Sequence, residues 1–146
     1  MIKLSKLTDY AVIVLSVLAQ TSEDHCTSVD LAQKTDLPEP TVSKILKLLA
    51  KGGLVASLRG SKGGYQLKQK AKAISIAEIV AVIEGPIAVT HCVDQSTECC
   101  DRSAICSMSG RWNKVNLAIQ ETLQKISLED MMGDQVMREI QLEQGH

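Results

Sequence analysis

The fold is decided by residues 28–51, which read SVDLAQKTDLPEPTVSKILKLLAK. Ser28 is a typical helix cap and predicts a short helix over Val29–Thr35. The prolines of Leu37–Pro40 then force a turn and favour the start of a second helix, because proline fits the first helical turn. In that second helix the apolar residues form a stripe that is expected to be buried: Val42, Ile45, Leu46 and Leu49. The pattern predicts a helix-turn-helix.

Two further helices are predicted around this motif. Upstream, apolar residues over Leu7–Leu18 recur at helical spacing, and Ser5 or Thr8 is available to cap that helix. Downstream, Ser75–Glu78 has the spacing of a capping box, and Gly85-Pro86 ends the helix that it begins. We therefore expect four helices in the first 85 residues.

A glycine-rich hairpin is predicted between the third and the fourth of these helices. Gly52-Gly53 ends the helix, and residues 54–58 and 65–67 read as strands around the tip Arg59–Gly64. A phosphate-binding loop is a poor alternative, because the tip lacks the Gly-Lys-Ser/Thr ending and a following helix. The expected fold is therefore mainly α, a winged helix-turn-helix with a two-stranded wing.

Charge is distributed unevenly along the chain, although the formal net charge is only −1. Residues 1–72 carry 11 Lys and Arg against 6 Asp and Glu, whereas residues 73–146 carry 5 against 11. A basic run alone more often marks a solvated face, but on a helix-turn-helix and its wing it predicts contacts to phosphates of duplex DNA. The residues expected to contact DNA are Thr41, Ser43, Lys44, Lys47, Lys51, Arg59 and Lys62.

The C-terminal part is expected to dimerise the protein. From Trp112 to Ile126 apolar residues repeat at three- and four-residue steps, which predicts a long helix without an obvious partner in so small a domain. Pairing with a second copy is the economical explanation. We therefore divide the chain into a winged-helix domain (1–85), a cysteine loop (86–110), a dimerisation helix with a short cap helix (111–132) and a mobile tail (133–146).

Four of the five cysteines fall in one polar stretch of fifteen residues that is expected to be a loop: Cys92, Cys99, Cys100 and Cys106. The chain begins without a recognisable signal peptide, which predicts a reducing, cytoplasmic location. There, clustered thiols more often bind a metal or sense redox state than form structural bridges. Zinc and a metal-free thiol switch both remain open, although the tight Cys-x-x-Cys pair of structural zinc sites is absent.

Several other classes of protein are disfavoured. Aromatic residues make up only 2% of the chain and Phe is absent, which argues against stacking platforms for single strands or RNA. No apolar run reaches membrane-spanning length. No nucleophile lies in a recognisable set with a base and an oxyanion-stabilising group, so neither an enzyme nor a small-molecule substrate is expected.

Four segments together resemble the Rrf2 family of iron–sulfur transcription regulators: Leu7–Ala11 (LTDYA), Gly53–Val55 (GLV), Arg59–Tyr65 (RGSKGGY) and the cysteine loop. Pro40–Lys44 and Glu84–Ile87 look most like the branch that regulates the SUF system of iron–sulfur cluster assembly. The resemblance implies a homodimeric repressor or dual regulator that binds operator DNA. It further implies a cluster, usually [2Fe–2S], and a response to cluster status, iron, redox stress or nitric oxide.

In this family three loop cysteines and a variable fourth ligand hold the cluster. The resemblance transfers these roles to Cys92, Cys106 and one of Cys99 or Cys100. Ser109 stands where the IscR branch has its histidine ligand, and a serine is a poor substitute for imidazole. The fourth ligand is expected to be Asp9 of the partner subunit, as in the NsrR branch, with the unused cysteine or His91 as alternatives. Without such a role, Asp9 is a helix N-terminal carboxylate favoured by the macrodipole.

Overall fold

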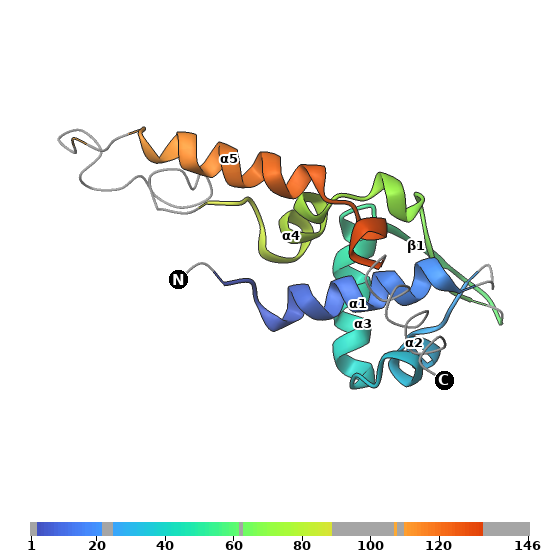
Figure 1. Cartoon of the computed structure of the whole chain (residues 1–146). Coiled ribbons are helices and arrows are strands. Elements are labelled where there is room, and N and C mark those ends of the chain that lie inside the picture. Colours follow the sequence, from blue (N-terminus) through green and yellow to red (C-terminus); the bar gives the residue numbers. More distant parts are fainter. Residues whose placement is uncertain (1–2, 22–24, 62, 89–106, 108–109, 133–146) are drawn as a thin grey trace, which may run out of the picture.

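The computed structural model describes residues 3–21, 25–61, 63–88, 107 and 110–132. Within them the chain is mainly helical, with one two-stranded antiparallel sheet (Figure 1). The elements are α1 (Lys6–Gln20), α2 (Ser28–Thr35), α3 (Glu39–Lys51), β1 (Val55–Leu58), β2 (Gly64–Leu67), the short 3-10 helix η1 (Ala71–Ala73), α4 (Ile76–Glu84) and α5 (Trp112–Lys125). This order confirms the predicted winged helix-turn-helix.

The core is aliphatic and is built around α3. The predicted stripe of α3 is completely buried, at Val42, Ile45, Leu46 and Leu49. It packs with buried residues of α1, α2 and α4 in one continuous cluster. Because each fully buried aliphatic side chain contributes about 1.5–3 kcal/mol, this stripe is a main determinant of where α3 sits.

Helix α2 begins one residue earlier than predicted. Thr27, not Ser28, is the cap, because its hydroxyl accepts the Asp30 N–H at 3.1 Å while the Asp30 carboxylate accepts the Thr27 N–H at 3.2 Å. The Thr27 hydroxyl also donates to the Asp30 carboxylate at 2.7 Å, and this bond, together with the one from the Thr27 N–H, lowers the pKa of Asp30. The reciprocal capping box needs an acidic residue three positions after the cap, and only Thr27 has one.

The wing is joined to the chain before α2. Its two strands pair from Val55–Leu67 to Leu58–Gly64, and the free edge of β2 pairs with Cys26 through backbone hydrogen bonds of 2.9 and 2.7 Å to Tyr65. A Cβ at Gly64 would lie 2.7 Å from the Cys26 carbonyl oxygen, so this close approach requires glycine. Cys26 lies in the connection between α1 and α2 and is buried beside the sheet.

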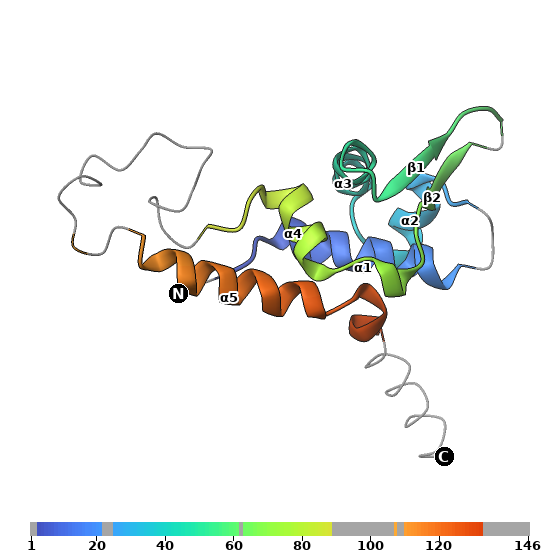
Figure 2. The same cartoon turned by 90° about the horizontal axis from the view of Figure 1, so that it is seen from above.

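Helix α5 is anchored at one end and projects at the other. Leu123 and Ile126 pack against the core, and Leu128 is fully buried. Reciprocal backbone bonds link Ile76 to Ile126 and Leu128 to Ile74, at 2.9 and 2.8 Å. The C-terminal half thus has a partner in α4 that the sequence did not reveal. The N-terminal half extends away from the helices α1–α3 (Figures 1 and 2).

A carboxylate joins the end of α4 to the start of α1. One oxygen of Glu84 accepts hydrogen bonds from the Ser5 N–H and, at 2.8 Å, from the hydroxyl of the buried Thr8. Hydrogen bonding by Ser5, and to a smaller extent by Thr8, lowers the pKa of Glu84 below its ordinary value of 4.5. The negative charge also lies at the helix N-terminus, where the macrodipole favours it.

Replacing Glu84 by Gln should lower the free energy of unfolding by about 1 kcal/mol at pH 7, a value reduced for solvent exposure. A carboxyl whose pKa is lowered by folding stabilises the protein above its unfolded pKa and loses that contribution as pH falls. Urea unfolding should therefore show the difference shrinking as pH falls below 4.5. Glu121→Gln, an exposed change of equal charge on α5, is the control. A deficit that is the same at every pH would refute the role of the charge.

Candidate nucleic-acid interface

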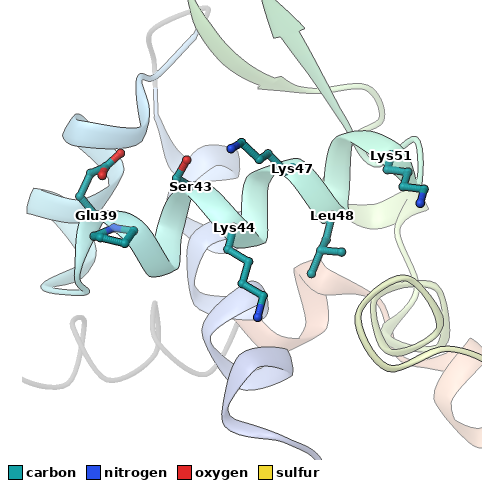
Figure 3. A pocket seen from close by; sticks show the side chains of 7 residues that line it. Glu39, Ser43, Lys44, Lys47, Leu48 and Lys51 are labelled. Carbon is teal, nitrogen blue, oxygen red and sulfur yellow. The ribbon is translucent and has the colours of Figure 1, made fainter.

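Burial of one stripe of α3 turns the opposite side of the helix to solvent. An open hollow runs along that outer side (Figure 3). It is lined by Glu39, Pro40, Ser43, Lys44, Lys47, Leu48 and Lys51. The hollow therefore follows a single exposed face of the second helix of the helix-turn-helix.

The residues of this face form two edges. Glu39, Ser43 and Lys47 follow one another along one edge, and Lys44 and Leu48 lie on the other (Figure 3). All three lysines of α3 are exposed. Four of the five α3 residues predicted to contact DNA thus share the face. The fifth, Thr41, is half-buried and does not line the hollow.

Three residues that were not predicted from the sequence also line the face: Glu39, Pro40 and Leu48. Glu39 is held across the turn, because the Ser28 hydroxyl donates to its Oε1 at 3.0 Å. Its position could have been found from spacing, since residue 39 precedes Ser43 by one helical turn. Positive charge as a criterion for DNA contacts excludes an acidic residue such as Glu39.

The wing lies on the same side of the molecule as α3. Figure 2 shows both on one side of α1 and α4, with α5 on the other. At the tip Arg59 and Ser61 are exposed, and the Gly63 N–H donates to the Gly60 carbonyl at 2.9 Å. Gly60 has φ +115°, a backbone conformation that favours glycine. Lys62 lies outside the described residues.

The predicted metal ligands are only partly visible. Asp9 lies in the first turn of α1, where its side chain is exposed beside Thr8 and near Met131. The positions of Cys92, Cys99, Cys100 and Cys106, and of the alternative ligand His91, lie outside the described residues. Among residues 3–21, 25–61, 63–88, 107 and 110–132, no three His, Cys, Asp or Glu side chains gather to form a metal site. None of the described helices is both long and apolar enough to cross a membrane.

Comparisons with known proteins agree with this geometry. Residues 4–134 match the Rrf2 family, described as an iron-dependent transcriptional regulator. The protein rrf2 of Nitratidesulfovibrio vulgaris is 31% identical over 121 residues, which cover 83% of this chain and 80% of that protein.

Two solved structures have the same fold and clear sequence similarity. IscR of T. potens superposes with a TM-score of 0.66 at 30% identity, covering 91% of this chain and 88% of the other. CymR, the global cysteine regulator of B. subtilis, superposes with a TM-score of 0.67 at 29% identity, covering 91% and 98%. The family and its homologues are DNA-binding transcriptional regulators and not enzymes, as the sequence predicted. The chain therefore belongs to the Rrf2 family of transcriptional regulators.

Proposed function

We propose that this protein is a homodimeric regulator that binds duplex operator DNA through α3 and the wing, and that its affinity follows the state of an iron–sulfur cluster. The observation that carries the DNA-binding part is the row of exposed lysines on the outer face of α3, with the wing on the same side. The cluster part is supported by the spacing of the cysteines and the family of the chain.

The shape and chemistry of this side suit a major groove. The major groove of DNA admits one α-helix. Lysines on that helix can neutralise the phosphates at the rim of the groove and release counterions. The Ser43 hydroxyl lies between Glu39 and Lys47 on one edge of the face, where it can approach base edges (Figure 3). The proposed contacts are Thr41, Ser43, Lys44, Lys47 and Lys51 on α3, with Arg59 and Lys62 in the wing gripping phosphates or the minor groove.

The homodimer is proposed from the uncovered part of α5. An apolar hollow along this helix is lined by Lys114, Val115, Ala118, Ile119, Thr122 and Leu123. Val115 and Trp112 are each 43% exposed, although they belong to the apolar repeat of the helix. A second copy would bury this face, and α5 lies on the side opposite to α3, so that dimerisation leaves the DNA-binding face free (Figure 2).

The cluster is proposed to be held by Cys92, Cys106, one of Cys99 or Cys100, and Asp9 of the partner subunit. The donor set fits, because thiolates are the usual ligands of iron–sulfur clusters and Asp9 is exposed at a helix start. A carboxylate holds iron less firmly than a thiolate does, which suits a cluster that is gained and lost. The genes controlled are proposed to be those of iron–sulfur cluster assembly.

Removing one lysine of α3 tests DNA binding. Lys47→Ala should weaken binding to duplex DNA about equally for all sequences and lower the slope of log affinity against log salt by about one, because one phosphate contact is lost. Arg59→Ala should weaken binding in the same way. Fluorescence anisotropy over a range of salt concentrations measures both, with Lys125→Ala on α5 as the control. Variants that bind with unchanged affinity and slope would remove α3 and the wing from the interface.

A charge on the apolar face of α5 tests the dimer. Val115→Glu should shift the protein from dimer to monomer in sedimentation experiments, because burial of an unpaired carboxylate in the interface is costly. Leu117→Glu is the matched control, since Leu117 is 55% exposed and does not line the hollow. A Val115→Glu protein that stays dimeric would place the interface elsewhere.

Loss of single ligands tests the cluster. Protein prepared without oxygen should contain matching amounts of iron and acid-labile sulfide, and Cys106→Ala should abolish both while the chain remains folded. Asp9→Ala should retain iron initially but lose it faster in air. Wild-type protein that takes up zinc alone, or no metal, would contradict the proposal and favour a zinc site or a thiol switch. An unchanged lifetime in Asp9→Ala would shift the fourth ligand to His91 or the second cysteine.

A further inference from the structure

We infer that Glu39 determines part of the DNA sequence preference, by accepting a hydrogen bond from the exocyclic amino group of a cytosine in the major groove. This inference rests on the proposed binding of duplex DNA by α3. Judged by its negative charge alone, Glu39 would be excluded from a DNA-binding surface.

Glu39 occupies the position from which a recognition helix reads bases. It is the first residue of α3, and the N-terminal residues of such a helix contact base edges. Its side chain is exposed and lines the same hollow as Ser43 and Lys47, along the same edge of the helix (Figure 3). Any duplex that fits this face would therefore meet the carboxylate as well as the lysines.

The charge of Glu39 makes it selective. It is the only acidic side chain among the residues that line the hollow, and no Asp or Glu occurs from Pro40 to Ala73. A carboxylate repels phosphates and the acceptor atoms of guanine and thymine, so a favourable contact requires a donor. In the major groove cytosine N4 is the donor that Glu typically pairs with.

Among the described residues, the Glu39 carboxylate is held by a hydrogen bond rather than by an ion pair. The Ser28 hydroxyl donates to Oε1 at 3.0 Å from the start of α2, which fixes the side chain and leaves Oε2 for another donor. Within the part of the chain that the structure describes, no lysine is recorded in an ion pair with Glu39, although three lysines share its face. Glu39 is therefore arranged to accept a hydrogen bond from a DNA base rather than to form a salt bridge within the protein.

A purely structural role makes a different prediction. A carboxylate in the first turn of a helix stabilises that helix through the macrodipole. If this were its only function, its replacement would alter stability and overall affinity and leave the preference for individual bases unchanged. Base preference is therefore the readout that separates the two roles.

The experiment is selection of bound sequences from a random duplex library by the wild-type protein and by Glu39→Gln, each purified without oxygen. Gln keeps the size of the side chain and can still accept from Ser28. We expect the wild type to select a site with a preferred cytosine in each half. Glu39→Gln should lose roughly tenfold in discrimination at that position and keep the other preferences. Ser28→Ala should weaken the same preference by a smaller factor.

Asp36→Asn is the matched control, because it removes one negative charge in the turn before α3 without lining the hollow. Unchanged base preferences in Glu39→Gln would overturn the inference while leaving the proposed DNA binding intact. The same loss in Asp36→Asn, or a wild-type protein that prefers adenine to cytosine at that position, would overturn it as well. A wild-type protein that binds no duplex at all would refute the proposed function, and this inference with it.

Discussion

Burial of the aliphatic stripe of α3 is the constraint on which the rest of the structure depends. With no Phe in the chain, the core is filled by Leu, Ile, Val and Ala, and α3 supplies four of the fully buried side chains. Complete burial of one side of α3 also fixes the orientation of its opposite, exposed side. The exposed lysines, Ser43 and Glu39 therefore lie on a rigid face rather than on a loop, which suits a surface that reads DNA.

The same core connects this face to the region of the proposed cluster. Helices α4 and α5 flank residues 85–111, which contain the four clustered cysteines, and both helices pack against the core. Glu84, the last residue of α4, holds the start of α1 through Ser5 and Thr8, and Asp9 is the next residue along α1. The proposed coupling would run from the cysteine segment, by way of α4 and α1, to the helices that support α3. Such coupling needs only a small bias between two arrangements of packed helices.

The spacing of residues in the sequence predicted the helices well. It did not predict which segments distant in the sequence pair with one another. The stripe of α3, the Ser75–Glu78 capping box and the wing were all readable, because each rests on local spacing. The pairing of Cys26 with Tyr65 was missed because two segments distant in the sequence form it. The capping role of Thr27 was missed because Ser28 is an equally good cap by residue type. For the interface, the lysines were found from charge, whereas Glu39 required the geometry of the helix face.

The most direct test of the account is a comparison of operator affinity between protein that carries its full complement of iron and sulfide and the same protein stripped of both. The operator would be the sequence selected by the wild-type protein, and all measurements would be made without oxygen at one salt concentration. The account predicts dissociation constants that differ by at least about tenfold, within the usual range of coupling between two sites. Equal affinities would contradict it, and would leave a DNA-binding protein whose cysteines do not control binding.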